Sequence, residues 1–519
     1  MKLGYLLGAA VVALTPAIAT AQVAPVPGVK NVIVIINDGG GATTYDALRL
    51  YRGRALTTDG QGFRRVSVST YPLRSDSAAN NQPGSTQQDP TVVFDSAKFW
   101  DTDPVAGLST IPGYFTPAST SAGFSPIPGP LYPAAFEGYE WSRYAHPDSG
   151  NTASSISSAV KSYNNSINVD GAGVPQVTIT DLIDSAVRVG KTTGVVSTVQ
   201  FSDATPAALG GAHNISRGNR TAIAGEMFAG GKLDVIGGTG NPDFNDDGLP
   251  RTPAYTWISA PLWTDLKANT NTSGLNSRRW QLLQDREPIE AIADKRVKPP
   301  VSPLAMIIKG DNSSQFNRTN TVTVNGVPIN ATQDTPYATP RKTNVPSLSK
   351  LTLAALNRLD QAGRGFYLMA EAGAVDRAEH ANNTGRMIEE LQESDDTVQA
   401  VIDWVNRKDT SANWDNTLLV ITADHDHLLY GPQGDTVPFQ PLEDRGAGQV
   451  PGNKWFGPNH GTGVVPLYLY GKGADVVAAA ATRNDTYTDE EGRTFGYGRY
   501  MDQTELGEIL KATLGQNRP

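Results

Sequence analysis

Residues 31–38 read Asn-Val-Ile-Val-Ile-Ile-Asn-Asp, a nearly unbroken run of β-branched side chains that ends in an acid. Such a run is typical of a parallel strand that is covered on both faces. Two later stretches repeat the pattern, since GFYLMA (365–370) is followed by Glu371 and TLLVIT (417–422) is followed closely by Asp424. Because ligands bind at the carboxyl ends of strands in open parallel sheets, we expect the three acids to meet at one site.

Helical patterns lie between these strands, for example at residues 351–359 and 387–404. This alternation predicts an α/β fold, a three-layer sandwich with a largely parallel central sheet and helices on both faces. Two segments depart from the pattern: residues 83–144 are rich in Pro, Gly, Ser and aromatic side chains, and residues 241–347 are polar. We interpret both as long insertions in one catalytic domain that spans residues 22–519.

The composition excludes several classes of function. The chain has 519 residues and a formal net charge of −9, so it has no basic excess for binding a nucleic-acid scaffold. Cysteine is absent, which excludes disulfides, cysteine nucleophiles and thiolate metal sites. Any metal ion must therefore be held by histidine, carboxylate and hydroxyl groups.

The N-terminus has the features of a signal peptide. Lys2 precedes an apolar stretch that ends near Leu14, and the small residues Ala19-Thr20-Ala21 stand where cleavage is expected. This stretch is shorter than the roughly 20 apolar residues of a membrane-spanning helix, although an uncleaved anchor is an alternative. We predict a signal peptide at residues 1–21, export to the periplasm or the extracellular space, and no stable membrane insertion.

Several histidines and acids have a spacing that suits metal binding. Asp376 and His380 are four residues apart, which puts both on one face of a helix. Asp424 and His425 follow a buried strand directly and offer the oxygen and nitrogen ligands that zinc accepts. His460 lies in the glycine-rich stretch GPNHGTG (457–463), which we expect to be a flexible loop. Taken alone, Asp376 and His380 are more typical of a solvated surface pair, and His460 of a surface residue. Asp424 and His425 could equally be a hydrogen-bonded structural pair. The joint occurrence of these residues favours a metal site.

The remaining three histidines, His146, His213 and His427, are expected to be structural or exposed. The stretch Asp243-x-Asn245-x-Asp247-Gly248 resembles the start of a calcium loop, but Ala254 occupies the position of the expected glutamate. We therefore predict a turn there.

Six stretches, in this order along the chain, resemble the motifs of the alkaline phosphatase family: NVIVIINDGG (31–40), DSGNTASSISSAVKSYN (148–164), DATPAALGGAHNISR (203–217), EAGAVDRAEH (371–380), TADH (422–425) and the loop around His460. Together they span roughly residues 31–470. Several motifs in the family's order are far more specific than one short pattern.

The resemblance implies a complete set of site residues. One zinc ion would be held by Asp376, His380 and His460. A second zinc ion would be held by Asp38, Asp424, His425 and the Ser149 hydroxyl. One magnesium ion would be held by Asp38, Thr205 and Glu371. Arg217 matches the arginine that binds substrate phosphate, Asp203 matches an acid near the magnesium and that arginine, and Arg377 is an additional candidate contact.

The resemblance also makes Ser149 the nucleophile. A serine hydroxyl is a weak nucleophile near neutral pH, and a divalent cation favours its alkoxide. Ser149 precedes a predicted helix at residues 151–162, whose amide groups would favour a bound anion. Two alternatives stay open: Ser149 caps this helix, or Thr152 is the nucleophile.

The predicted function is hydrolysis of phosphate monoesters through a covalent phosphoserine, with small phosphorylated substrates. One alternative is a phosphodiesterase of the same superfamily. A second is a catalytically silent exported protein that binds metal or phosphate. The sequence leaves the natural substrate and the oligomeric state open.

Overall fold

The computed structural model describes residues 24–73, 94, 96–104, 136–144, 146–176, 181–275, 278–318, 322–324, 327–329 and 335–516. The predicted signal peptide at residues 1–21 and most of the segment 83–144 lie outside these residues. Among the helices that are described, none combines the length and the hydropathy needed to cross a membrane.

The centre of the fold is β1 (Asn31–Ile36), whose six residues are all buried. It pairs in parallel with β10 (Thr417–Thr422) on one side and with β9 (Phe366–Glu371) on the other. Alternate side chains of β1 enter two different cores, Val32, Val34 and Ile36 one and Ile33 and Ile35 the other. The continuous apolar run therefore has the cause that we expected, which is burial on both faces.

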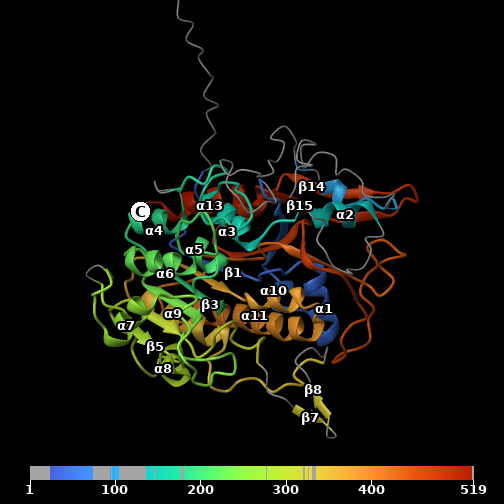
Figure 1. Cartoon of the computed structure of the whole chain (residues 1–519). Helices are drawn as coiled ribbons and strands as arrows, with labels where there is room; N and C mark the ends of the chain where they lie inside the picture. The colour runs from blue at the N-terminus through green and yellow to red at the C-terminus, as the bar shows by residue number, and fades with distance from the viewer. Residues whose placement is uncertain are drawn as a thin grey trace, which may run out of the picture.

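In the part of the chain that the structure describes, the central sheet has 11 strands (Figure 1). Their order across the sheet is β14 (Arg483–Thr488), β15 (Thr494–Asp502), β2 (Arg64–Ser69), β13 (Val465–Gly471), β10, β1, β9, β3 (Thr192–Gln200), β4 (Val235–Thr239), β6 (Leu304–Ile307) and β5 (Gln281–Leu283). Neighbours from β10 to β5 are all parallel, whereas β13 is antiparallel to both β10 and β2. The prediction of a largely parallel sheet is confirmed.

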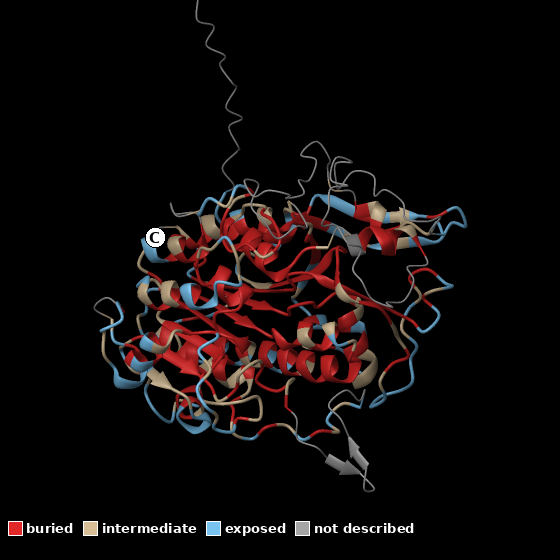
Figure 2. Cartoon of the chain, viewed as in Figure 1, coloured by how far each residue is buried: buried red, intermediate tan, exposed pale blue. Residues whose placement is uncertain are grey.

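Helices cover both faces of the sheet (Figure 1). One layer contains α3 (Ser149–Ser158), α4 (Leu182–Arg188), α5 (Ala204–Leu209), α6 (Arg220–Ala229), α7 (Ala260–Ala268), α12 (Ala474–Ala479) and α13 (Gln503–Leu514). The other contains α1 (Ala42–Arg52), α8 (Arg286–Ala293), α9 (Leu348–Asp360), α10 (Ala374–His380) and α11 (Thr384–Val405). Figure 2 shows buried residues through the sheet and exposed residues toward the periphery. The three-layer α/β fold class is thus confirmed, and α9 and α11 include the two predicted helical stretches.

The segment 241–347 is more than a surface insertion. It supplies α7, α8 and the strands β5 and β6, which extend the central sheet to its edge through pairing with β4. The strands are short, and polar stretches surround them, so the sequence pattern did not reveal them. A separate pair, β7 (Val322–Val324) and β8 (Val327–Ile329), forms a small hairpin in the same segment.

The stretch around His460 is a strand and not the flexible loop that we expected. β12 (Lys454–Gly461) pairs antiparallel with β11 (Asp426–Tyr430), and His460 lies opposite His427. The glycine and proline residues of this stretch predicted a loop, but pairing with β11 and burial override that local preference. His460 therefore has a fixed position.

The described parts of the segment 83–144 support this hairpin. The 3₁₀ helix η2 (Ser96–Trp100) and α2 (Glu137–Tyr144) pack with β11 and β12 in an aromatic cluster that includes Trp100, Tyr139, Tyr430 and Phe456. The Ser142 hydroxyl also accepts a hydrogen bond of 2.7 Å from the backbone amide of Thr462. A second 3₁₀ helix, η1 (Thr57–Asp59), lies between α1 and β2.

Candidate active site

Three acids lie at the carboxyl ends of the three central strands. Asp38 follows β1, Asp424 follows β10, and Glu371 is the last residue of β9. Ile36 of β1 is in register with both Thr422 and Glu371, so the strand ends are level. The sheet therefore brings the three carboxylates to one edge, as the sequence predicted.

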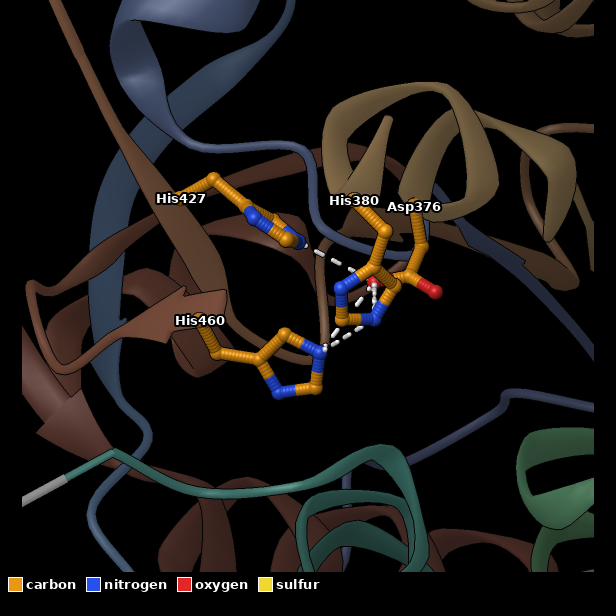
Figure 3. Close-up of side chains that lie close together, drawn as sticks. All are labelled: Asp376, His380, His427 and His460. Atoms are coloured by element: carbon orange, nitrogen blue, oxygen red, sulfur yellow. Dashed lines mark hydrogen bonds and ion pairs between the residues drawn. The ribbon is translucent and has the colours of Figure 1, made fainter. Parts of the chain in front are cut away.

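The first metal cluster consists of Asp376, His380, His427 and His460 (Figure 3). α10 supplies Asp376 and His380, and the β11–β12 hairpin supplies His427 and His460. One oxygen of Asp376 lies 3.2 Å from Nε2 of His380 and 3.2 Å from Nε2 of His460. The two Nε2 atoms are 3.0 Å apart.

The hydrogen bonds of His380 and His460 show which ring nitrogen of each carries hydrogen and which is directed at the cluster. Nδ1 of His380 contacts the carbonyl oxygen of Pro458, and Nδ1 of His460 lies 2.8 Å from the carbonyl oxygen of Pro147. Carbonyl oxygens only accept, so both Nδ1 atoms carry hydrogen, and in the neutral rings each Nε2 atom has a lone pair. Two such lone pairs 3.0 Å apart repel one another. Either a proton or a metal cation must lie between them.

The separations among these three ligand atoms suit a zinc ion. Zinc binds histidine nitrogen at roughly 2.0–2.1 Å in a tetrahedral shell, which places ligand atoms a little over 3 Å apart. Burial opposes protonation of His460, but the hydrogen bond and charge of Asp376 outweigh burial and raise its pKa. Burial lowers the pKa of His380 and favours its neutral, metal-binding form. The residues therefore fit a zinc ion.

The second metal cluster consists of Asp38, Asp424 and His425, which are all buried. Nε2 of His425 lies 3.3 Å from Oδ1 of Asp38 and 3.3 Å from Oδ2 of Asp424. Burial, followed by the neighbouring acids, raises the pKa of Asp38 well above its ordinary value, and burial raises that of Asp424 to about 6. A divalent cation would offset this repulsion, so these residues also fit a metal ion.

Glu371 and Thr205 fit a hard cation such as magnesium. Burial raises the pKa of Glu371 to about 8, and the Ser197 hydroxyl donates to one of its oxygens. The Thr205 hydroxyl, on α5, is buried and has no hydrogen-bond partner among the described residues. α5 contacts β9, and Asp203, the N-cap residue of α5, is close enough to Glu371 for its charge to raise the pKa of that carboxyl. A hydroxyl without a partner is readily explained as a ligand of an oxygen-seeking ion.

Ser149 is the first residue of α3 and is buried. Its Oγ lies 3.2 Å from Nε2 of His425 and 3.5 Å from Oδ1 of Asp38. The capping role falls to Asp148, whose carboxylate accepts a hydrogen bond of 3.1 Å from the amide of Asn151. The helix ends at Ser158, earlier than expected, because Ala159 adopts a left-handed conformation with φ 59°.

Thr152 has a different environment from Ser149. Its hydroxyl lies 3.0 Å from the carbonyl oxygen of Asp148 and 3.2 Å from the carboxylate of Asp424, two acceptors that compete for its single hydrogen. Ser149 lines the adjacent cavity, whereas Thr152 is not among the described residues that line it. The geometry therefore favours Ser149 over Thr152 as the group that meets a substrate.

The cavity in front of Ser149 has a volume of about 600 Å³ and is lined by Arg217 and Arg377. Asp203 holds both guanidinium groups: one oxygen accepts from Arg217 at 2.8 Å, and the other contacts Arg377. Burial opposes ionisation of Asp203, but the two arginines outweigh burial and lower its pKa to about 2. Asp148 also contacts Arg217, at 3.1 Å. Two oriented cations thus face the cavity, as binding of a phosphate dianion requires.

His427 is the residue of this site that the sequence analysis did not assign. It is buried, and its Nε2 lies 3.0 Å from the carboxylate of Asp376. No signal in the sequence indicates this role, because it depends on contact with Asp376, which is 51 residues away along the chain. The other predicted ligands all lie in or beside the two clusters.

Three predicted structural features lie outside these clusters. His213 is held between Glu226 and the carbonyl oxygen of Gln176, at 2.8 Å from each. His146 contacts the carbonyl oxygen of Pro147, and burial lowers its pKa to about 4. The Asn245 carboxamide accepts from the amides of Asp247 and Leu249, which forms the predicted turn.

Known proteins similar to this chain support the fold and indicate a family. An alkaline phosphatase of Escherichia coli (strain K12) is 27% identical over 384 residues, which cover 71% of this chain and 74% of that protein. Alkaline phosphatase 4 of Bacillus subtilis (strain 168) is 27% identical over 287 residues, which cover 54% of this chain and 50% of that protein. The solved alkaline phosphatase of Thermus thermophilus has a TM-score of 0.56 at 17% identity, with 98% of this chain and 97% of that chain covered.

The structural similarity shows a shared fold. Both sequence relatives are named alkaline phosphatase. A family model described as alkaline phosphatase matches residues 137–507, which is well over half of the chain and includes most of the residues of both metal clusters. The chain therefore belongs to the alkaline phosphatase family.

Proposed function

We propose that the protein hydrolyses phosphate monoesters through a covalent phosphoserine on Ser149, at a site that holds two zinc ions and one magnesium ion. The observation that carries this proposal is the position of the Ser149 hydroxyl. It lies 3.2 Å from His425 in the second metal cluster and also lines the cavity that contains Arg217. A nucleophile, a metal site and a phosphate-binding group are thus close together, as phosphoryl transfer requires.

The proposed ligands follow from the clusters. Asp376, His380 and His460 would hold one zinc ion. Asp38, Asp424, His425 and the Ser149 oxygen would hold the other. Asp38, Thr205 and Glu371 would hold magnesium. When bound, these ions would lower the pKa of the Ser149 hydroxyl and of water, and would neutralise charge on the phosphoryl oxygens.

The side chains of the protein carry the remaining parts of the reaction. Arg217, oriented by Asp203 and Asp148, donates to two nonbridging oxygens of the phosphate and fixes the phosphorus in front of Ser149. The Ser149 oxygen loses its proton and attacks phosphorus, and the ester bond breaks as the alcohol leaves and takes up a proton. Water then cleaves the bond between Ser149 and phosphorus, which releases phosphate and restores the hydroxyl.

The amide groups at the start of α3 favour the anion that accumulates on Ser149. Ser149 is the first residue of this helix, so the phosphoryl group of the intermediate would lie near the positive end of the helix dipole. The helix is anchored by the Asp148 cap and by its packing against α13. Small phosphorylated compounds are the proposed substrates, and export of the protein stays a prediction.

The test compares hydrolysis of p-nitrophenyl phosphate with that of bis-p-nitrophenyl phosphate, with the mature protein loaded with zinc and magnesium. We expect a strong preference for the monoester, because Arg217 and the magnesium ion that Thr205 and Glu371 would hold can offset a second nonbridging charge. Preference for the diester would instead assign the protein to the phosphodiesterases. Hydrolysis of neither compound would favour a binding protein without catalytic activity.

A further inference from the structure

The cavity in front of Ser149 is larger than a phosphoryl group needs. Its volume of about 600 Å³ lies in the range of pockets that accept whole small molecules, roughly 300–1,000 Å³. Beyond Arg217 and Arg377 it is lined by a second group of residues, which includes Gln200, Arg220, Thr256, Trp257 and Asn312. None of these five residues belongs to either metal cluster, so they are available to contact the leaving group of a bound substrate.

Arg220 is held over the indole ring of Trp257. Its guanidinium carbon lies 4.2 Å from the centroid of the ring, a distance typical of a cation–π contact. Trp257 itself is only 6% exposed, and its carbonyl oxygen accepts a hydrogen bond of 3.0 Å from Ser202. The ring is therefore a fixed platform, and it restricts an otherwise exposed arginine to one region of the cavity wall.

Arg220 differs from the other cations near the cavity because it forms no ion pair with any residue that the structure describes. Arg217 and Arg377 share Asp203, and Arg251 pairs at 2.6 Å with Asp311, an acid that also lines the cavity. Among the described residues, no carboxylate lies within ion-pair distance of Arg220. Its positive charge is thus available to a ligand in the cavity.

The position of Arg220 in the chain keeps it close to the phosphate-binding arginine. It is the first residue of α6 and follows Arg217 after only two residues. The backbone amide of Arg217 is fixed by a hydrogen bond of 2.6 Å to Asn165, another residue of the cavity wall. Two cations from one short segment therefore face the same cavity, and within the described parts of the chain only Arg217 is paired with acids.

We propose that Arg220, supported by Trp257, forms an anion subsite for the leaving group. The protein then prefers phosphate monoesters that carry a second anionic group, such as another phosphate, a few atoms from the ester bond. This inference rests on the proposed function and adds a substrate class to it. Arg220 acts in binding and selection, while the groups around Ser149 act in the chemical step.

The test uses a hexose 1,6-bisphosphate and the corresponding hexose 6-phosphate, which contain the same kind of ester and differ in the second charge. For the full-length metal-loaded protein we expect a higher kcat/KM for the bisphosphate. Arg220→Gln should lower kcat/KM for the bisphosphate by about 10-fold, the scale of one hydrogen bond to a charged group, and change that for the monophosphate less than about twofold. Arg220→Lys should keep part of the preference.

Two further measurements make the test specific. The preference for the bisphosphate should weaken as salt increases, because Arg220 is exposed and salt screens the charge of an exposed group. Arg279→Gln is the matched control. Arg279 is exposed and does not line the cavity, and its substitution changes the net charge by the same amount as Arg220→Gln. An active protein in which Arg220→Gln leaves the ratio of the two kcat/KM values unchanged would overturn the subsite. A wild-type protein that hydrolyses neither compound would instead overturn the proposed function, and the subsite with it.

Discussion

One carboxylate oxygen of Asp376 lies within 3.2 Å of three imidazole nitrogens. Those of His380 and His460 are proposed zinc ligands, and the third belongs to His427. His427 is fully buried, and burial lowers its pKa to about 3, so its ring is neutral. A neutral ring can donate one N–H to Asp376 and orient the carboxylate toward the metal, as partners of metal ligands commonly do. We therefore assign a positioning role to His427.

Replacement of His427 by glutamine should weaken zinc binding about 10- to 100-fold, the usual effect of losing such a partner. The variant should regain activity when zinc is in large excess, because the ligands themselves remain. Zinc titration monitored by calorimetry and by activity checks both points. His213→Gln is the control, since His213 contacts Glu226 and Gln176 outside the clusters. A zinc-saturated His427→Gln protein that stays inactive would contradict the positioning role.

At the scale of elements, the start of α3 connects folding to the site through Asp148. Its carboxylate accepts hydrogen bonds from the amides of Asn151, at 3.1 Å, and Asn165, at 2.8 Å, and it contacts Arg217 at 3.1 Å. The first contact caps the helix that carries Ser149, and the third orients the phosphate-binding arginine. Stability and substrate binding therefore depend on different contacts of one side chain.

Two substitutions of Asp148 should separate these contributions. Asp148→Ala removes the cap and should lower the free energy of unfolding by about 1–2 kcal/mol, whereas Asp148→Asn keeps a capping oxygen and should cost only a small part of that. Both should raise KM, because Arg217 loses an ionic contact. Denaturant unfolding and steady-state kinetics measure the two effects. Ser347→Ala, which removes the cap of α9, should destabilise the protein without a change in KM. Equal destabilisation by the two Asp148 substitutions would argue against the capping assignment.

The elements differ in how far the sequence predicts them. β1, β9 and β10 are continuous apolar runs that end in acids, so both their type and their common edge could be predicted. β12 could not, because its glycine and proline residues favour a loop, and only pairing with β11 and packing of the aromatic cluster make it a strand. β5 and β6 are too short, at 3 and 4 residues, to give a periodic signal.

The same distinction applies to the site. Ligand candidates next to apolar strands or in family-like motifs could be predicted from the sequence. The roles of His427 and Arg220 could not, because each depends on a neighbour that is distant along the chain, Asp376 for one and Trp257 for the other. Such contacts are properties of the tertiary structure alone.

At the scale of the whole molecule, the two metal clusters join segments that are far apart in the sequence. The first joins α10 to the β11–β12 hairpin, and the second joins the ends of β1 and β10 close to α3. The second cluster also buries carboxylates whose pKa values are raised by burial and by one another. Bound cations would offset that repulsion and cross-link the fold.

Removal of metal by a chelator should therefore lower the melting temperature as well as the activity. Added zinc should restore both the melting temperature and the activity. A free zinc concentration of about 1,000 times the Kd would stabilise the folded protein by about 4 kcal/mol. Differential scanning calorimetry of apo and zinc-loaded protein measures this effect. Asp376→Asn should reduce the stabilisation, since it weakens a ligand of the first cluster. A melting temperature that is independent of chelator and of added zinc would contradict a structural role for the metals.

The most direct measurement identifies the residue that becomes phosphorylated. The metal-loaded protein is mixed with excess p-nitrophenyl phosphate at mildly acidic pH, quenched in acid, digested and mapped by mass spectrometry. We predict that the wild-type protein carries a phosphoryl group on Ser149. Ser149→Ala should lose this group, and its kcat should fall at least about 1,000-fold. Thr152→Val should still be phosphorylated on Ser149. A phosphoryl group on Thr152, or full turnover by Ser149→Ala, would contradict the account.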